Sequence, residues 1–222
     1  SITGYTCGDL FFQEALQEDA LLGMLEIAEH TAHLDIISIV GLPIVIGQQL
    51  LNVAAVIQQG HILGLIPKSY LPNYKEFYEQ RWFVSAFDNL MSEYDIRGEH
   101  IPVGNDLLFS TPEVVFGIEI CEDLWAPVPR SSVLAIQGAE IIFNLSASNE
   151  CVGKHKYLRT LISQQSGWLI AGYVYSSCGF GESSTDVVFS GNAFICENGS
   201  FLCEANRFDY EPQLLVNDID VD

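Results

Sequence analysis

The chain has 222 residues, of which 49% are hydrophobic, and its 29 acidic side chains against nine basic ones give a formal net charge of −20. This length and apolar content predict a single domain with a sizeable hydrophobic core. The negative charge disfavours nucleic-acid and anionic-membrane partners, and no apolar stretch approaches the roughly 20 residues that a membrane span requires. We interpret the charge as a contribution to solubility rather than as a docking site for a cationic partner.

The first half of the chain predicts one long helix followed by three strands. Apolar residues spaced as on one face of a helix run from about residue 9 to residue 33. The predicted strands are apolar runs at 36–40, ending at Gly41-Leu42-Pro43, and at 52–57 and 61–66, the last two joined as a hairpin through Gln58-Gln59-Gly60. The next segment, 67–112, has many Tyr, Phe and Pro residues, and we expect a long irregular loop of functional importance.

The second half predicts alternating strands and helices, with a hairpin near its end. The expected helices cover residues 130–137 and 155–165, the second ending at Gly167. The expected strands lie at 114–120, 141–145, 168–175, 187–197, 201–204 and 214–220, with Asn198-Gly199 as the turn between 187–197 and 201–204. Because strands alternate with helices and hairpins bracket them, the pattern favours a layered α/β fold with a mixed sheet.

The stretch V-V-F-G-I-E-I-C-E-D-L-W, residues 114–125, places Cys121 at the end of a strand that we expect to be buried on both faces. Glu122, Asp123 and a Pro-rich turn follow at once, so the thiol would be presented at a strand-to-helix elbow. A nucleophile is useful there, off a rigid strand and near the free N–H groups of a helix start. The alternative for a lone cysteine in this setting is a buried structural role.

A second candidate is Lys68, which ends another strand-like run and is bracketed by Pro67 and Pro72. Lysines are scarce, with four in the chain, so we expect a lysine in such apolar surroundings to do more than improve solubility. Burial there would let it trade protons with a substrate, whereas the alternative is a lysine at a loop edge with its charge in water. Glu79 follows within one or two turns, where it would hold the ammonium or pair with Arg81 at the surface.

The six cysteines show no C-x-x-C pair and no zinc-ligand spacing, which favours a reducing, cytoplasmic location. His30 and His33, with Asp35 nearby, have a spacing that could share a metal. They lie near the end of the predicted helix, where a cation suits the helix dipole, so we expect no metal site. The sequence also contains no G-x-x-x-x-G-K-[ST], G-x-G-x-x-G or S-G-G-x-D-S nucleotide-binding motif.

The segments K-x-x-L-P-N-Y…F-x-E, from Lys68 to Glu79, and G-I-E-I-C-E-D-L-W, at 117–125, resemble the nitrilase superfamily. Within it, they resemble the glutamine-hydrolysing domain of glutamine-dependent NAD synthetases. Three further stretches fit that subfamily: S-I-T-G-Y-T-C-G-D-L-F at 1–11, N-L-S-A-S at 144–148 and Y-V-Y-S-S-C-G-F-G-E-S-S-T-D at 173–186. The resemblance covers essentially the whole chain. It implies a single domain over residues 1–222, built as a four-layer α-β-β-α sandwich with mixed sheets.

The resemblance also implies a Glu-Lys-Cys triad, in which Cys121 attacks a carboxamide, ammonia leaves and water resolves a thioester. Lys68 and the backbone N–H of Glu122 are suited to stabilise the oxyanion, and Glu79 is the further residue expected in the catalytic group. The side chains implied around the substrate are Tyr5, Glu122, Trp125 and Ser148, with Tyr74 and Tyr175 as weaker candidates. For each of these, a packing role is the alternative.

The sequence departs from the family pattern at the general base, because no residue of the chain matches the family's glutamate. The family's glutamate precedes the S-x-x-G-Y segment, so we expect it one or two positions before Ser1, together with a first strand–helix–strand unit; Glu14 and Glu18 fall in the following helix and do not replace it. Without this base, Ser1–Asp222 alone is expected to be a poor catalyst.

The resemblance implies partners as well as chemistry. L-glutamine is the implied substrate, a homo-oligomer is the expected assembly, and a synthetase domain of the same polypeptide would bind ATP, Mg and deamido-NAD. No cofactor is expected in this domain itself. The alternatives are a free-standing nitrilase-like amidase or carbamoylase, or a catalytically inactive fragment that retains only the fold.

Overall fold

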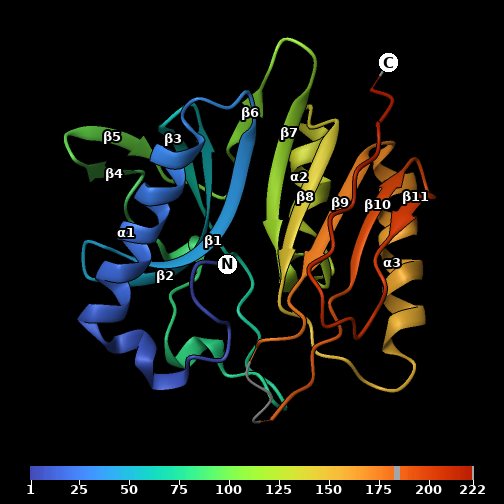
Figure 1. The fold of residues 1–222 in the computed structure, drawn as a ribbon, viewed down its shortest axis with the longest axis horizontal. Helices are drawn as coiled ribbons and strands as arrows, with labels where there is room; N and C mark the ends of the chain where they lie inside the picture. The colour runs from blue at the N-terminus through green and yellow to red at the C-terminus, as the bar shows by residue number, and fades with distance from the viewer. Residues whose placement is uncertain (183–185, 222) are drawn as a thin grey trace. The chain divides into compact units, whose positions relative to one another are not determined.

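The computed structural model describes residues 1–182 and 186–221. It comprises two compact units, Ser1–Leu107 and Leu108–Asp222, each with its own sheet and its own hydrophobic core. Figure 1 shows the first unit in blue to green and the second in green to red. Across the part of the chain that is described, no helix is both long and apolar enough to cross a membrane.

In the first unit, one helix packs against an antiparallel sheet. The sheet has the order β1 (Ile37–Ile46), β2 (Gln49–Gln58), β3 (His61–Pro67), and α1 (Glu14–Thr31) follows the short helix η1 (Gly8–Phe12). Met24 of α1 packs with Val53 and Leu65 in one buried cluster. Residues 53–57 of the central strand are each 0% exposed, so both faces of β2 are covered. The predicted hairpin is confirmed, and Gln59 and Gly60 turn it with positive φ angles.

Three expectations for the first unit need correction. The strand predicted at 36–40 continues to Ile46, because β1 lies at the end of the sheet and an edge strand tolerates the missing N–H of Pro43. The predicted helix is interrupted at Gln13, whose backbone is extended. Segment 67–112 is less irregular than expected. It contains the hairpin β4 (Glu93–Ile96) and β5 (Glu99–Pro102) and the short helices η2 (Glu79–Arg81) and η3 (Ala86–Asp88).

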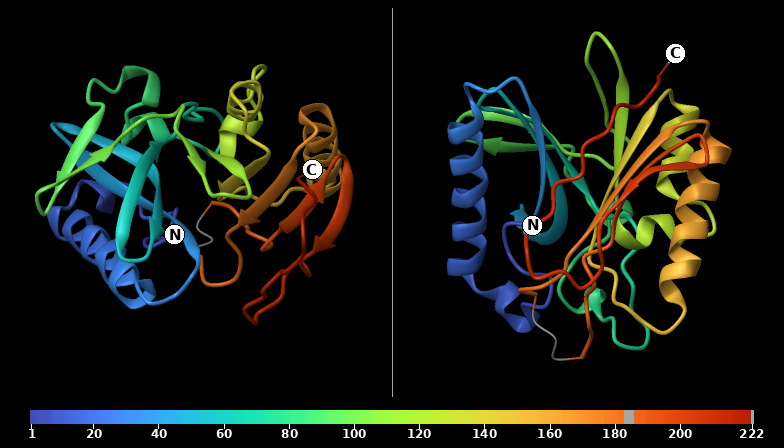
Figure 2. Two further views of the ribbon diagram at one scale, coloured as in Figure 1. Left: turned by 90° about the horizontal axis from the view of Figure 1, so that it is seen from above. Right: turned by 45° about the vertical axis from the view of Figure 1, so that its right-hand side comes forward.

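The second unit is a six-stranded mixed sheet with two helices on one face. Its order is β11-β10-β9-β8-β7-β6, in which β7, β8 and β9 are parallel and the other neighbours antiparallel. The helices α2 (Arg130–Ile136) and α3 (Lys154–Leu169) connect β7 to β8 and β8 to β9, and both cover the same face (Figure 2). The strands are β6 (Leu108–Ser110), β7 (Val115–Ile120), β8 (Ile141–Ser146), β9 (Gly172–Ser177), β10 (Ala193–Glu197) and β11 (Ser200–Glu204), and the short helix η4 (Cys121–Leu124) follows β7. Sites in such sheets form at the carboxyl ends of the parallel strands.

The predictions for the second unit fail in three places. Helix α3 runs past Gly167, so the strand predicted at 168–175 begins only at Gly172. Gly167 allows close packing rather than ending the helix, since a Cβ there would lie 3.4 Å from the Cα of Gly199 in the β10–β11 turn. β10 begins at Ala193 instead of residue 187. The described residues 214–220 do not form the predicted strand. Ile219 lies against Gly172 of β9, and Asn217 Nδ2 donates to the carbonyl of Leu202 on β11 at 3.4 Å, but the segment is not part of the sheet and Leu214 is 87% exposed.

Candidate active site

The predicted contact between Lys68 and Glu79 is present in the first unit. Lys68 directly follows β3, and Glu79 is the first residue of η2. The Lys68 Nζ donates to both carboxylate oxygens of Glu79, at 2.6 and 2.8 Å. Each side chain is only 1% exposed, so the two form a buried ion pair. The alternative partner, Arg81, pairs with Asp9 at 2.7 Å.

Further hydrogen bonds hold this ion pair in place. The Lys68 N–H donates to the carbonyl of Asn52 on β2 at 2.9 Å, and the Glu79 N–H donates to the carbonyl of Pro72 at 3.0 Å. The Tyr5 hydroxyl donates to Glu79 Oε1 at 2.9 Å. The Glu79 carboxylate therefore accepts three hydrogen bonds and supports the lysine. The Tyr5 hydroxyl thus donates to Glu79. The substrate contact expected of Tyr5 stays a prediction.

The second unit presents Cys121 at the junction of a strand and a helical turn, as predicted. β7 ends at Ile120 and η4 begins at Cys121. The backbone of Cys121 is left-handed, with φ 47°, a conformation that costs a non-glycine residue about 1–3 kcal/mol. Two side chains pin this turn: the Asp123 carboxylate accepts from the N–H of Ile120 at 3.0 Å, and Asn144 Oδ1 accepts from the N–H of Cys121 at 3.2 Å. The approach of Lys68 to the Cys121 sulfur stays a prediction.

A cation and two aromatic rings follow the turn. The half-buried Glu122 is the second residue of η4, and Trp125, directly after η4, stacks on Tyr157 of α3 with ring centroids 5.7 Å apart. The Lys154 Nζ lies 5.3 Å from the centroid of the Trp125 ring and donates to Asn149 Oδ1 at 2.6 Å. This arrangement puts a positive charge beside one of the residues expected to contact the substrate, and such a charge can bind a carboxylate.

Ser148 and Tyr175 lie at the carboxyl ends of neighbouring strands. Ser148 is 5% exposed, and its N–H donates to Ser177 Oγ at 3.1 Å. The Tyr175 hydroxyl donates to Ser146 Oγ at 2.9 Å. Burial, and next the negative charge of Cys121, raise the pKa of Tyr175 well above its usual range. A tyrosine whose pKa is raised in this way keeps its hydroxyl proton and can donate a hydrogen bond. Tyr74, the other weaker candidate, lies in the first unit and is 49% exposed.

All six cysteines of the chain lie within the described residues, and none of them forms a disulfide bond. Burial raises the pKa of the Cys178 thiol well above its usual range, and the charges of Glu182 and Cys121 add to the effect. Burial also raises the pKa of Cys196, to about 12. Thiolates therefore form poorly at these two positions, which makes them unsuitable as nucleophiles.

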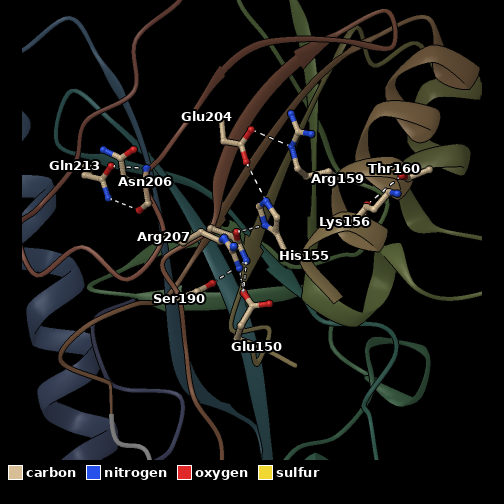
Figure 3. Close-up of polar contacts among 11 residues, drawn as sticks. Glu150, His155, Lys156, Arg159, Thr160, Ser190, Glu204, Asn206, Arg207 and Gln213 are labelled. Carbon is tan, nitrogen blue, oxygen red and sulfur yellow. Dashed lines mark hydrogen bonds and ion pairs between the residues drawn. The ribbon is translucent and has the colours of Figure 1, made fainter. Parts of the chain in front are cut away.

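A polar cluster anchors the segment that leads from β8 into α3 (Figure 3). Its members are Glu150, His155, Arg159, Asn192, Glu204 and Arg207. His155 contacts Asn192 at 2.9 Å and Glu204 at 3.3 Å, and Asn192 also donates to Glu150 at 3.3 Å. The cluster thus ties the first turn of α3 to Asn192, directly before β10, and to Glu204 at the end of β11, and it holds the helix turn from which Lys154 extends.

Some parts of the site were not predicted from the sequence. Lys154 carries no motif of its own, whereas Glu119 had a signal as the one charge within an apolar strand, and Asn144 opens the N-L-S-A-S segment. Residues 183–185, which belong to the predicted segment 173–186, lie outside the described residues.

Among residues 1–182 and 186–221, no group of three or more His, Cys, Asp or Glu side chains is placed to hold a metal ion.

Comparison with known proteins relates this arrangement to a family. The family model for carbon-nitrogen hydrolases matches residues 1–222. The glutamine-dependent NAD(+) synthetase of Mycobacterium bovis is 36% identical over 225 residues, which cover 100% of this chain and 33% of that protein. The corresponding enzyme of Aquifex aeolicus is 30% identical over 94% of this chain and 34% of that protein. The chain therefore spans about a third of the length of these relatives.

Solved structures share the fold. A glutamine-dependent NAD(+) synthetase from Cytophaga hutchinsonii superposes with a TM-score of 0.84 at 28% identity, covering 94% of this chain and 34% of that chain. A carbon-nitrogen hydrolase from Helicobacter pylori G27 gives a TM-score of 0.76 at 19% identity over 100% of this chain and 74% of that chain, a likeness of fold alone. These matches confirm the predicted α/β fold of nitrilase type. With the family model matched along its full length, the chain belongs to the carbon-nitrogen hydrolase family.

Proposed function

We propose that this chain is the glutamine-hydrolysing part of a glutamine-dependent NAD synthetase, and that it releases ammonia from the glutamine side chain. The observation that carries the proposal is the turn at Cys121, a half-buried thiol at the end of a parallel strand and at the first residue of a helical turn. Relatives named for glutamine-dependent NAD synthesis support the choice of glutamine. A synthetase domain of the same polypeptide would use the ammonia with ATP, Mg and deamido-NAD in the cytoplasm, in a homo-oligomer.

In the proposed reaction, Cys121 Sγ attacks the carboxamide carbon, and the carbonyl π electrons move onto oxygen as the C–S bond forms. The N–H of Glu122 and the Lys68 ammonium are the proposed donors to this oxyanion. Collapse of the intermediate breaks the C–N bond, and the nitrogen takes a proton and leaves as ammonia. Water then hydrolyses the thioester to glutamate and regenerates the thiol. Glu79 already accepts from Lys68 and Tyr5, so the proton transfers require another carboxylate.

Recognition of glutamine also needs partners for its two charged α-groups. We assign the α-carboxylate to Lys154, whose ammonium lies beside the Trp125 ring. The Glu122 side chain suits the α-ammonium, because the two charges are opposite. Trp125 would form a wall of the pocket, and Ser148 and Tyr5 would contribute hydrogen-bonding groups to it.

The test compares two nitrogen sources in the full-length protein. Cys121→Ala is expected to abolish NAD formation from glutamine and to leave NAD formation from ammonia intact, while Cys203→Ala, at a half-buried cysteine of β11, should change neither rate. A glutamyl thioester on the Cys121 peptide should be detectable by mass spectrometry after an acid quench. Glutamine hydrolysis that survives Cys121→Ala would contradict the proposal. Faster hydrolysis of a simple aliphatic amide than of glutamine would instead favour a free-standing amidase.

A further inference from the structure

A buried polar network lies directly behind the turn that carries Cys121. It joins Glu119 of β7, Asn144 of β8, Tyr173 of β9 and the N–H of Ser131 in α2, and each of these residues is at most 1% exposed. Asn144 Nδ2 donates to Glu119 Oε1 at 3.3 Å and to the Tyr173 hydroxyl oxygen at 3.0 Å. The Tyr173 hydroxyl donates to Glu119 Oε1, and the Ser131 N–H donates to Glu119 Oε2 at 2.7 Å. The network ends at Cys121, whose N–H donates to Asn144 Oδ1.

Donor and acceptor chemistry fixes the orientation of the Asn144 amide. The N–H of Cys121 is only a donor, so it requires the amide oxygen, and the Glu119 carboxylate accepts, so it requires the amide nitrogen. The Glu119 carboxylate accepts hydrogen bonds from Asn144 on β8, from Tyr173 on β9 and from the N–H of Ser131 in α2. Burial raises the pKa of Glu119, and the hydrogen bonds from Tyr173, Ser131 and Asn144 oppose this effect.

Stability alone does not call for this arrangement. A strand covered on both faces is as stable with a well-packed apolar residue as with a buried charge, which must be stripped of water. The left-handed backbone of Cys121, however, persists only where its surroundings over-determine it. A network held by three strands and a helix supplies such a constraint at the Cys121 N–H.

We propose that Glu119, Asn144 and Tyr173 are positioning residues that hold the backbone of Cys121 in its left-handed conformation and thereby aim the thiol at the substrate carbon. The inference rests on the proposed role of Cys121 as the nucleophile. The three side chains act through the backbone of Cys121.

An exchange of the two polar groups tests this role. In E119Q, the amide NH₂ of the new glutamine must face a group that donated a hydrogen bond to the carboxylate, so two donors meet. In N144D, two carboxylates face each other. In the double variant E119Q/N144D, the Gln nitrogen donates to the new carboxylate and to the Tyr173 oxygen. The Tyr173 hydroxyl then donates to the new carboxylate, and the acceptors for the N–H groups of Ser131 and Cys121 remain. The double variant therefore restores every hydrogen bond of the network. The three bonds among the side chains of residues 119, 144 and 173 run in the reverse direction, and the two bonds from backbone N–H groups are unchanged.

We expect each single variant of the full-length protein to lose on the order of 100-fold in kcat for glutamine with little change in KM, because a small misplacement of the nucleophile has this effect. The double variant should recover most of the loss. Alkylation of Cys121 by iodoacetamide should slow in both single variants and recover in the double variant. Ser166→Ala is the matched control: its buried hydroxyl bonds the carbonyl of Ala171 in the same unit, so its loss should lower Tm and leave kcat unchanged.

Single variants with wild-type kcat and wild-type alkylation would overturn the proposal, and so would a double variant no better than the single ones. If the single variants do not fold, Tyr173→Phe replaces them, since it removes only a hydroxyl. It should likewise lower kcat for glutamine with little change in KM, and a wild-type kcat would overturn the proposal. If the wild-type protein fails to hydrolyse glutamine, the proposed function fails, whereas the alkylation rates still decide whether the network positions Cys121.

Discussion

Replacing Lys68 by methionine should both destabilise the protein and stop glutamine hydrolysis. Lys68 and Glu79 are each 1% exposed, and the ammonium donates to both carboxylate oxygens. Methionine fills a similar volume but leaves the Glu79 carboxylate buried without its counter-ion. Removal of one partner from a buried ion pair costs about 3–5 kcal/mol.

A change of this size is easily measured. For a domain of this length, each kcal/mol lowers Tm by about 2–4 °C, so Lys68→Met should lower it by roughly 6–20 °C. The double variant Lys68→Met/Glu79→Gln removes both charges and keeps an oxygen acceptor for the Tyr5 hydroxyl. It should regain most of the lost Tm, because two neutral side chains need no counter-ion. Differential scanning calorimetry of the three proteins checks the stability values.

Activity should not follow stability in this series. If Lys68 donates to the oxyanion as proposed, both the single and the double variant lose about 10²–10³-fold in kcat for glutamine. Tyr70→Phe is a suitable control, because it alters a half-buried side chain two residues away and should leave kcat unchanged. A Lys68→Met protein with wild-type Tm would refute the reasoning about the buried pair. A double variant with wild-type kcat would refute the catalytic role of the ammonium.

Three further predictions follow from the site and its surroundings. At pH 8, iodoacetamide should label Cys121 well before Cys178, whose pKa burial raises; peptide mapping that finds Cys178 labelled first would exclude Cys121 as the reactive thiol. Lys154→Met should raise KM for glutamine by about 10- to 100-fold, the value of a hydrogen bond to a charged group, with a smaller effect on kcat, and an unchanged KM would remove it from the substrate site. The pKa of Asp9 is lowered by its hydrogen bond from Arg81, so the stabilisation by this exposed pair is present above the ordinary aspartate pKa and is lost as the pH falls. Asp9→Asn should accordingly change Tm only slightly at pH 7 and low salt, and a large loss that persists in 1 M salt would contradict an exposed, screened pair.

The features that the sequence determines by itself are short-range. The turn at Gln59-Gly60 and the turn at Asn198-Gly199 were predicted because few residues adopt positive φ easily, and both hairpins are confirmed. The presentation of Cys121 at the end of β7 follows in the same way, from an apolar run that stops at polar residues. The contact between Lys68 and Glu79 was predicted as well, because an unpaired buried ammonium is costly and the spacing across the proline turn permits the pair.

Tertiary packing decided the features that depend on distant parts of the chain. Helix α3 continues through Gly167 because the residue packs against Gly199, 32 positions along the chain, and the local helix signals say nothing of this contact. The same holds for the alternating residues 214–220, which match a strand pattern and touch β9 and β11 but do not join the sheet.

The site divides along the same line. Cys121, the proposed nucleophile, lies in a local motif, whereas the support for its backbone comes from Asn144, Tyr173 and Ser131, which belong to three other elements. Glu119 was visible in the sequence as a charge in an apolar strand, yet its partners are brought to it only when β8, β9 and α2 assemble around β7. Periodicity records which face of an element is buried, but a buried carboxylate is stable only beside donors from other elements, and only the folded chain determines which donors those are.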